Sequence, residues 1–378
     1  MPDMASPGGR SSQLCFPPSL SVPILSECSP EYFLSSIVPR GLPCVIRGAA
    51  VGPCVSLWGD PGYLKSKIED RLVTVHVAPQ PERLDFRKKN FKYLSMPFHE
   101  LLERVQPGQA GQEPAPLLQQ GEGYYFRDAE AADSGGKTSS SSRRAARACF
   151  FSSYPELAKD VALEDWYCKA RYFSSVLRLS SAGLRLFMHY DVPDNIYLQV
   201  VGRKRILLWA PEEALNLYLH GDKSLIVNPD DADPSVFPLF ATAKRHECLL
   251  FPGDLLYIPA LWLHSTFSVD CSVAVNIFWT PLEATLYDPK DWYGNRDPLP
   301  VQRARQGIEK AIQQLQQLPE KYRDFYGRLL ARQIESKCLC KPLFTHAQST
   351  RTDTGAEGGA EADAIEEEAQ TRQPNGAE

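Results

Sequence analysis

Residues 173–281 consist largely of short apolar runs separated by turn residues. The runs are four to eight residues long, and Gly, Pro or Asp residues stand between them. Strands of this length, with no long helical pattern between them, predict an antiparallel barrel or jelly roll. The predicted strands are 175–179, 184–188, 196–201, 205–209, 247–251, 255–258 and 272–279, with Gly202 in the turn of the central hairpin.

The region before residue 173 mixes helix and strand patterns. Ser29 and Pro30 are the residue types preferred at a helix cap and at the first helical position. Residues 96–105 predict a second helix. Runs rich in β-branched or aromatic residues predict strands at 44–47, 72–77 and 124–126. We expect this part of the chain to complete the barrel.

After Pro281 the pattern changes to that of helices. Residues 301–318 and 320–338 place apolar side chains at helical spacing, and Pro319 separates the two segments. The predicted fold class is therefore mainly β with flanking helices: a double-stranded β-helix, or jelly roll, plus a C-terminal helical pair.

These patterns divide the chain into five predicted segments. They are a disordered N-terminus (1–20), an N-terminal α/β part (21–172), the barrel core (173–281), a C-terminal helical region (282–344) and a disordered acidic tail (345–378). The N-terminus and the tail lack enough apolar residues to order themselves. A mobile insertion is predicted at about 129–148, where Gly and Ser residues precede Arg143, Arg144 and Arg147.

Charge and cysteine content narrow the class of protein. The formal charge is −5, but residues 345–378 carry eight acidic and two basic residues, hence −6, which leaves about +1 for the rest. Ten cysteines are scattered without a secretory signal pattern at the start, and no run of eighteen apolar residues exists. We expect an intracellular protein that does not cross a membrane.

Two histidine–x–aspartate triplets occur in the chain, and their contexts differ. With seven histidines and 46 acidic residues among 378, roughly one triplet is expected by chance, so the motif alone is weak. His189-Tyr-Asp191 ends an apolar strand, in which side chains two residues apart point to the same face. His220-Gly-Asp222 is predicted to be a solvated turn. We therefore expect His189 and Asp191 to be two ligands of a metal ion.

A third ligand is expected on another strand of the same sheet system. His264 is the candidate, because it follows a Gly253-Asp254 turn, an apolar strand and a proline at position 259. The alternative is a buried histidine that bonds to the backbone. The other four histidines lack a strand and motif like those around His189 and His264, and are expected to be structural or solvated: His76, His99, His246 and His346.

Two histidines and one carboxylate favour a particular metal chemistry. They occupy one face of an octahedron and leave three positions open, which suits Fe(II) with a bidentate 2-oxo acid and dioxygen, and suits structural zinc poorly. The cosubstrate 2-oxoglutarate also needs a cation for its distal carboxylate. Lys204 alternates with Ile206 and Leu208, so its ammonium is predicted to point inward. The alternative is an exposed basic turn at residues 203–205.

Taken together, these residues resemble the JmjC branch of the 2-oxoglutarate-dependent oxygenases. The resemblance is carried by His189-Tyr-Asp191, Asn195, Lys204, Gly253-Asp254, Pro259, Trp262-Leu-His264 and Asn276-Ile-Phe-Trp279. Within that branch the chain is similar, from about residue 22 to 338, to the hydroxylases that form hydroxywybutosine on phenylalanine tRNA.

The resemblance implies a cupin-like JmjC barrel and a set of roles. His189, Asp191 and His264 would bind Fe(II), and Tyr125, Asn195 and Lys204 would hold 2-oxoglutarate. Phenylalanine tRNA would be the substrate, and the C-terminal helix pair would form a homodimer. The Ser-rich stretch near 134–147 and the acidic tail depart from the family pattern and lie outside its motifs.

An RNA substrate would require cationic and aromatic side chains near the mouth of the barrel. The candidates are two basic clusters, Arg87, Lys88, Lys89, Lys92 and Arg143, Arg144, Arg147, and the aromatic residues Tyr93, Tyr124 and Trp166. A solvated charged face is the alternative for either cluster. Two other functions stay open: a JmjC hydroxylase or demethylase acting on peptides, and a cupin-like binding module without activity.

Overall fold

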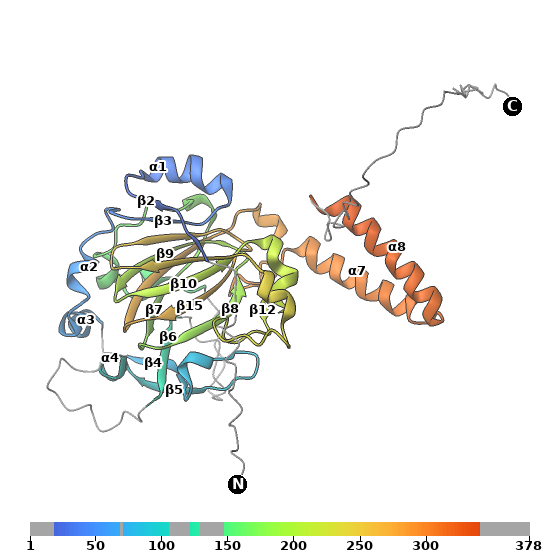
Figure 1. Cartoon of the computed structure of the whole chain (residues 1–378). Coiled ribbons are helices and arrows are strands. Elements are labelled where there is room, and N and C mark those ends of the chain that lie inside the picture. Colours follow the sequence, from blue (N-terminus) through green and yellow to red (C-terminus); the bar gives the residue numbers. More distant parts are fainter. Residues whose placement is uncertain (1–18, 69–70, 106–120, 129–146, 341–378) are drawn as a thin grey trace, which may run out of the picture. The chain divides into compact units, whose positions relative to one another are not determined.

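The computed structural model describes residues 19–68, 71–105, 121–128 and 147–340, so most of the predicted disordered N-terminus, the insertion and the acidic tail lie outside the described residues. The chain divides into two compact units, Met1–Arg305 (unit 1) and Gln306–Glu378 (unit 2), both drawn in Figure 1. Unit 1 holds every strand that the structure describes.

The described strands form two sheets. The seven-stranded sheet has the order β1-β13-β10-β15-β8-β12-β11. Its strands are β1 (Leu20–Ser21), β8 (Arg185–Tyr190), β10 (Lys204–Trp209), β11 (Leu219–His220), β12 (Lys223–Ser224), β13 (Arg245–Leu250) and β15 (Leu263–Ser268). The nine-stranded sheet has the order β2-β3-β14-β9-β16-β7-β6-β4-β5. Its strands are β2 (Ile24–Leu25), β3 (Cys44–Ile46), β4 (Leu72–Ala78), β5 (Lys92–Pro97), β6 (Gly123–Arg127), β7 (Tyr172–Ser180), β9 (Asp194–Val201), β14 (Leu255–Ile258) and β16 (Ser272–Trp279).

Successive strands alternate between the two sheets. Strands β8, β9 and β10 lie in the seven-, nine- and seven-stranded sheets in turn, and β13 to β16 repeat the alternation. Neighbouring core strands pair antiparallel. The predicted central hairpin is wrong, because β9 and β10 pair with other strands in different sheets, and Gly202, with φ of 73°, lies where the chain crosses from one sheet to the other. The predicted mainly β fold of the jelly-roll type is confirmed.

Two differences from the predicted elements concern strands. Residues 263–268 form β15, which was not predicted, although it carries His264. Met96 and Pro97 belong to strand β5, so the helix predicted at 96–105 begins only at Phe98. Both segments mix apolar and polar residues, and neighbouring strands, rather than local hydrophobicity, decide their conformation.

The helices of unit 1 cover one face of the nine-stranded sheet (Figure 1). The described helices are α1 (Pro30–Tyr32), α2 (Cys54–Leu57), α3 (Pro61–Lys67), α4 (Phe98–Val105), α5 (Phe150–Ser153) and α6 (Pro155–Ala158). The Oγ atom of Ser29 accepts a hydrogen bond from the Tyr32 amide at 3.2 Å, which confirms the predicted cap. Phe33, Trp58 and Trp166 join Tyr257 and Trp279 of the sheet in the main apolar core.

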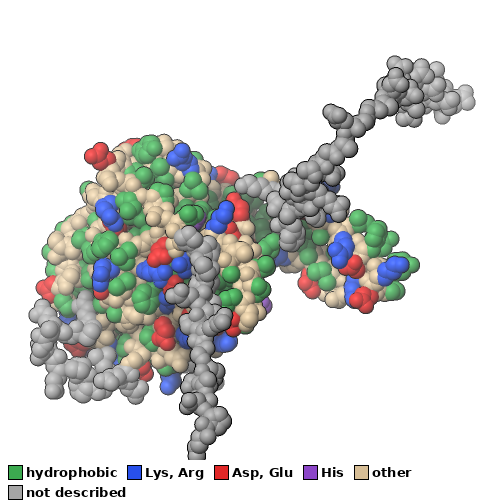
Figure 2. Space-filling view, in the orientation of Figure 1, with side chains coloured by type: hydrophobic (Ala, Val, Ile, Leu, Met, Phe, Trp, Pro, Cys, Tyr) green, Lys and Arg blue, Asp and Glu red, His purple; other side chains and the backbone are tan. Residues whose placement is uncertain are grey.

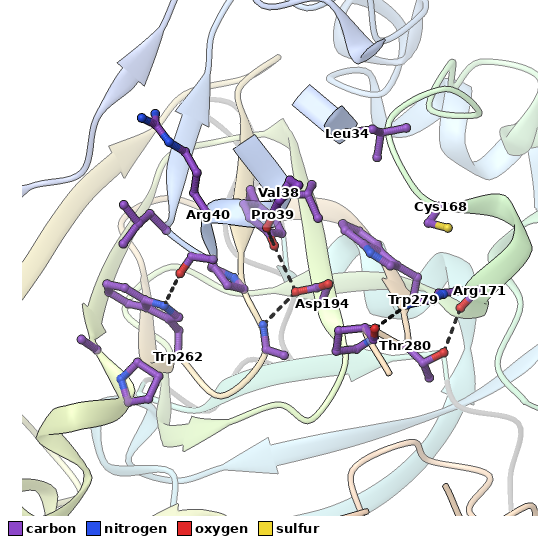
Figure 3. A pocket seen from close by; sticks show the side chains of 18 of the residues that line it. Leu34, Val38, Pro39, Arg40, Cys168, Arg171, Asp194, Trp262, Trp279 and Thr280 are labelled. Carbon is purple, nitrogen blue, oxygen red and sulfur yellow. Dashed lines mark hydrogen bonds between the residues drawn. The ribbon is translucent and has the colours of Figure 1, made fainter. Parts of the chain in front are cut away.

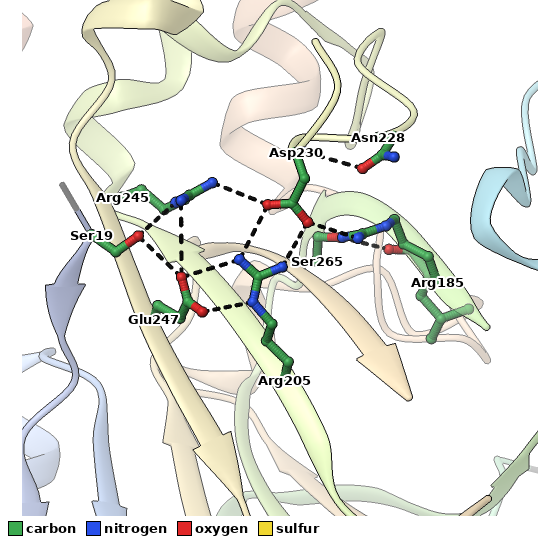
Figure 4. A network of polar contacts seen from close by, with 9 residues as sticks. Ser19, Arg185, Arg205, Asn228, Asp230, Arg245, Glu247 and Ser265 are labelled. Carbon is green, nitrogen blue, oxygen red and sulfur yellow. Dashed lines mark hydrogen bonds and ion pairs between the residues drawn. The ribbon is translucent and has the colours of Figure 1, made fainter. Parts of the chain in front are cut away.

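The seven-stranded sheet carries a network of ion pairs on one of its faces (Figure 4). Asp230 accepts hydrogen bonds from Arg185 at 2.8 Å, Arg205 at 2.6 Å and Arg245 at 3.2 Å. Glu247 accepts one more from Arg205 at 2.6 Å. These contacts join β8, β10 and β13 to the long segment between β12 and β13, because Asp230 lies in that segment.

Unit 2 contains most of the C-terminal helical pair. Helix α7 (Leu299–Leu315) begins in unit 1 and continues into unit 2, and α8 (Glu320–Cys338) begins at the predicted residue. Neither helix has a buried residue. Hydrophobic side chains therefore stand between charged ones on the visible surface of these helices (Figure 2). Among the described helices, none is long and apolar enough to cross a membrane.

Candidate functional site

Two adjacent strands bring the three predicted ligands together. Strand β8 pairs antiparallel with β15, and in that register His189 stands directly opposite His264. Asp191 follows one residue after β8. Its two carboxylate oxygens lie 4.0 Å from His189 Nε2 and 3.7 Å from His264 Nε2. One potential ligand atom from each residue lies within 4.8 Å of the others.

Backbone hydrogen bonds fix the orientation of both imidazole rings. His189 Nδ1 lies 2.9 Å from the carbonyl oxygen of Phe187, and His264 Nδ1 lies 3.0 Å from that of Trp262. A carbonyl can only accept, so in each ring Nδ1 carries the proton and donates it. In a neutral imidazole the lone pair is then on Nε2, the atom that faces Asp191.

The electrostatics of the site keep the ligands in metal-binding form. Burial and the neighbouring His264 lower the pKa of the His189 imidazole to about 4, so His189 is neutral at pH 7. Burial alone would raise the pKa of the Asp191 carboxyl, but the two histidines and two nearby arginines outweigh it and lower that pKa. A carboxylate beside two imidazoles whose Nε2 atoms face it is a donor set for a divalent cation.

Asn295 holds the segment that contains Asp191. Its Oδ1 accepts a hydrogen bond from the Val192 amide at 2.9 Å, and its Nδ2 donates to the Tyr190 carbonyl at 3.2 Å and to Asp222 at 3.0 Å. These contacts imitate those of a neighbouring strand just where β8 ends. The sequence analysis gave Asn295 no role, because a lone asparagine between aromatic and charged residues carries no pattern.

Lys204 lies deeper in the barrel. Its side chain is buried and points inward, as the alternation along the strand predicted, and its Nζ lies 3.4 Å from Ser180 Oγ. Burial and then the nearby Arg178 lower the pKa of the Lys204 ammonium to about 7. No acidic side chain among the described residues pairs with it. The role of Lys204 as a cosubstrate ligand stays a prediction.

Arg178 links the other two predicted cosubstrate residues. Its Nε donates to Asn276 Oδ1 at 2.6 Å, and Asn276 Nδ2 donates to Asn195 Oδ1 at 2.9 Å. Its Nη1 donates to the Tyr125 hydroxyl. Tyr125 and Asn195 are thus held by one polar network, which strand pairing alone could not reveal. Arg178 was not predicted as a site residue, because it stands within the predicted strand 175–179 and no motif marks it.

A cavity of about 810 Å³ opens onto two residues of the triad, His189 and Asp191, whereas His264 is not among its lining residues. His189, Asp191, Tyr125 and Arg178 line it, whereas Lys204 and Asn195 are not among its lining residues. The aromatic rings of His76, Phe86, Tyr93 and Phe187 line it. Phe91 packs against three of these rings, and the centroids of neighbouring rings in this group lie 4.7–5.5 Å apart. His76, for which no site was expected, therefore lies in the wall of the cavity.

Several predicted substrate contacts are wrong. Tyr124 and Trp166 are buried in the main core and cannot stack on a base, whereas Tyr93 is 62% exposed and lines the cavity. Asp222 also lines the cavity, although the His220–Asp222 triplet was expected to be a solvated turn. His220 itself is exposed.

The two basic clusters differ in how far the structure describes them. Arg143 and Arg144 lie outside the described residues, and the Arg147 guanidinium stacks over the Phe173 ring at 4.3 Å. Arg87 is bound to Asp85 at 3.0 Å. Lys88, Lys89 and Lys92 are exposed.

A second cavity, of about 1000 Å³, contains none of the triad (Figure 3). Asp194 in its wall accepts hydrogen bonds from the Ala260 amide at 2.9 Å and the Tyr257 hydroxyl at 3.1 Å. The Leu261 amide donates to the Asp191 carbonyl at 2.8 Å. The loop that leads to His264 is therefore bound to the loop that follows His189, which fixes the distance between the two ligand-bearing segments.

Comparison with known proteins agrees with this geometry. A family model described as a cupin-like domain matches residues 30–285. The chain belongs to the cupin-like family. It is 40% identical over 335 residues to tRNA wybutosine-synthesizing protein 5 of Danio rerio, a match that covers 89% of this chain and 98% of the relative. The protein of the same name from Homo sapiens is 39% identical over 324 residues, covering 85% and 98%.

A fungal relative of this cupin-like protein is much longer. The tRNA wybutosine-synthesizing protein 4 of Neurospora crassa is 32% identical over 312 residues, which are 80% of this chain but 24% of the relative. Both kinds of relative carry the wybutosine pathway in their names. The resemblance expected from the motifs is thereby confirmed at the level of the family.

Replacement of Asn295 by Ala in this cupin-like protein should loosen the ligand-bearing segment. The Asn295→Ala variant should bind Mn(II) roughly 10- to 100-fold more weakly, as expected when a group that orients metal ligands is lost. Titration followed by electron paramagnetic resonance measures this affinity. Asn90, whose side chain likewise bridges two backbone groups at 2.8 Å each, provides the control. Equal metal affinity in the Asn295→Ala and Asn90→Ala variants would contradict the role of Asn295.

Proposed function

We propose that this protein is an Fe(II)- and 2-oxoglutarate-dependent hydroxylase that acts on the wybutosine side chain of phenylalanine tRNA. The observation that carries the chemistry is the set of two imidazoles and one carboxylate, of which His189 and Asp191 line a cavity. The substrate class rests on the relatives, which are named for wybutosine synthesis and match nearly their whole length.

The residues fit the proposed metal ion. The distances of 4.0 and 3.7 Å between imidazole nitrogens and carboxylate oxygens do not exceed twice a metal–ligand bond of roughly 2.1 Å. An ion between these atoms can therefore touch both rings and Asp191 after small side-chain movements. The three ligands leave the side of the ion that faces the cavity open to a cosubstrate.

The cosubstrate would be held along the barrel axis. His264 and Ser268 both belong to β15, and Ser268 is the register partner of Lys204. At roughly 3.3 Å per residue, the triad and Lys204 are separated by the length of a small dicarboxylate plus a lysine side chain. Lys204 would pair with the far carboxylate, and Tyr125 and Asn195 would contact the rest of the molecule.

Bound Fe(II) and 2-oxoglutarate would supply the oxidation of an unactivated C–H bond by dioxygen, coupled to the conversion of 2-oxoglutarate to succinate and carbon dioxide. The protein's own groups have simpler tasks. His189 and His264 would present Nε2 to the ion, and the backbone carbonyls of Phe187 and Trp262 keep their rings in place. The aromatic wall at the cavity excludes water and offers flat faces to an extruded base.

We further propose that the chain pairs with a second copy through its C-terminal helices. Large apolar side chains on α8 are exposed by 41–58%, namely Tyr322, Phe325, Tyr326, Leu329, Leu330 and Ile334. An apolar surface of this extent on a helix is typical of an interface. The JmjC family resemblance supplies the identity of the partner as another copy of this chain.

The triad is tested by single replacements. His189→Ala and His264→Ala should each abolish Fe(II)-dependent succinate formation while thermal unfolding remains cooperative, because an ion held by two ligands lacks the facial geometry. Succinate released during turnover is the measurement. His220→Ala changes an exposed histidine outside the site and should retain activity. Turnover in either of the first two variants would refute the proposed metal site.

Lys204 should make 2-oxoglutarate binding depend on pH. Its pKa of about 7 in the free protein means that, above this pH, binding of a carboxylate must first restore the proton. The affinity for 2-oxoglutarate should therefore fall up to about tenfold per pH unit as pH rises above 7. Calorimetric titration from about pH 6 to 9 measures this slope. A Lys204→Arg variant, which stays charged, should show a flatter profile. The same slope in a Lys204→Met variant would assign the dependence to another group.

The helical interface is tested by charge insertion. Phe325→Glu and Leu329→Glu each place a carboxylate among the exposed apolar residues of α8, one helical turn apart. Either should shift the sedimentation of the protein from dimer to monomer. Lys321→Glu alters a polar residue of the same helix and should leave the dimer in place. A wild-type protein that sediments as a monomer at micromolar concentration would rule out the interface.

A further inference from the structure

Four Arg and Lys side chains line the cavity onto which His189 and Asp191 open: Arg71, Arg127, Arg178 and Lys223. Three of them have partners. Arg71 donates to the Ser153 carbonyl at 2.8 Å and stacks over the Tyr154 ring at 3.9 Å. Lys223 donates to the Asp222 carboxylate at 2.6 Å. Arg178 donates to Asn276 and to the Tyr125 hydroxyl, as described above.

Arg127 differs from these three. It is the last residue of β6, and its partly buried side chain makes no hydrogen bond or ion pair with any residue that the structure describes. Its Nε atom is sealed from solvent and has no partner. A guanidinium normally finds acceptors for its five donors. Here the donors face a cavity whose described residues satisfy none of them.

The position of Arg127 is also electrostatically unfavourable. In the pairing of β6 with β7, Arg127 stands directly opposite Arg178. Like charges in directly opposed positions destabilise a sheet. Burial and then the Arg178 charge lower the pKa of Arg127. The nearby Asp191 offsets part of this effect. The fold therefore holds at the cavity a cation that has no hydrogen-bonded partner among the described residues, and an anionic ligand would offset its cost.

The anion expected at Arg127 differs from the cosubstrate carboxylate assigned to Lys204. Arg127 lines the open cavity together with Tyr293 and Asp191, whereas Lys204 is buried beyond it and is not part of its lining. The charge of Arg127 contributes to the lowered pKa of Asp191, which places it within electrostatic reach of the triad. An anion bound there would lie on the side from which a substrate enters.

We propose that Arg127 binds an anionic group of the RNA substrate, either a carboxylate on the modified base or a phosphate of its backbone. This inference rests on the proposed function, because it takes RNA as the substrate. The planar guanidinium matches either group through two parallel hydrogen bonds. Such a contact holds the substrate in position above the triad, so Arg127 is a substrate-binding residue.

The test compares Arg127→Gln with the full-length wild-type protein on phenylalanine tRNA whose modified base carries a free side-chain carboxylate. For Arg127→Gln, kcat/KM for tRNA should fall by roughly 10- to 100-fold, the usual effect of losing a charged hydrogen-bonded pair. The KM for 2-oxoglutarate, and its decarboxylation without RNA, should remain unchanged. Arg127→Lys keeps the charge but loses the fork, and should restore only part of the loss.

Arg203→Gln provides the matched control. Arg203 is exposed and paired with Asp270 at 2.7 Å, and it lies at the turn between β9 and β10, at the far end of β9 from Asp194. The Arg203→Gln variant loses the same charge as Arg127→Gln but does not alter the cavity, so its kcat/KM for tRNA should equal that of the wild type. An equal loss of kcat/KM in both variants would show that the effect is a general electrostatic attraction for RNA, and would overturn the proposal.

Two further measurements identify the anion. If Arg127 contacts a phosphate, Arg127→Gln should reduce the salt dependence of tRNA binding by about one unit of slope. If it contacts a carboxylate, the slope of the salt dependence should stay the same. The loss of kcat/KM in Arg127→Gln should then disappear on RNA whose modified base carries the methyl ester instead of the carboxylate. A rise in the KM for 2-oxoglutarate that accounts for the whole loss would assign Arg127 to the cosubstrate and overturn the proposal.

Failure of the inference and failure of the proposed function give different results. Wild-type protein that hydroxylates tRNA, with Arg127→Gln equally active, contradicts the role of Arg127 alone. Wild-type protein that forms no product on tRNA contradicts both. Thermal unfolding of each variant shows whether a loss reflects the fold, and Arg127→Lys, the smallest change of side chain, keeps the test open if Arg127→Gln unfolds.

Discussion

The pairing of β8 with β15 is the constraint on which the candidate site depends. It places His189 opposite His264 and leaves Asp191 just beyond the end of β8. A shift by one residue would turn every side chain of the strand to the other face and separate the three ligands. The loops at this end preserve the register, because Asp194 and Asn295 bind the backbone on both sides of the triad.

The barrel interior also shows how charge is distributed inside a β fold. Apolar residues such as Ile206 and Leu208 fill one part of it, while Lys204 is buried and has no acidic partner in the described part of the chain. The Arg127 Nε atom likewise has no partner among the described residues. Both cations cost stability where they stand. A binding site for acidic groups explains this cost, whereas packing alone does not.

The sequence predicted the strands whose cores are continuous apolar runs, because hydrophobic periodicity records burial directly. It also predicted both ends of α8, whereas α7 begins two residues before and ends three residues before the predicted positions. Strand β15 escaped because its residues His264, Ser265 and Thr266 are polar and buried, which is the signature of a site and not of a core. The proximity of the three residues of the triad and the inward direction of Lys204 could be predicted, because each stands in a strand pattern with a motif. Asn295, Arg178 and Arg127 could not, because their importance arises from contacts between residues more than fifty positions apart.

For the aromatic residues, the sequence predicted substrate contacts that the structure does not allow. Tyr124 and Trp166 are suitable for stacking by type, but both are buried in the core. Tyr93 looks no different in the sequence and is exposed at the cavity.

The central claim, an iron-dependent hydroxylase of tRNA, is tested most directly by turnover with Fe(II), 2-oxoglutarate and dioxygen on wybutosine-containing phenylalanine tRNA beside a peptide library. The account predicts succinate in step with the gain of one oxygen atom on the tRNA base. A gain of oxygen on peptides alone would contradict it.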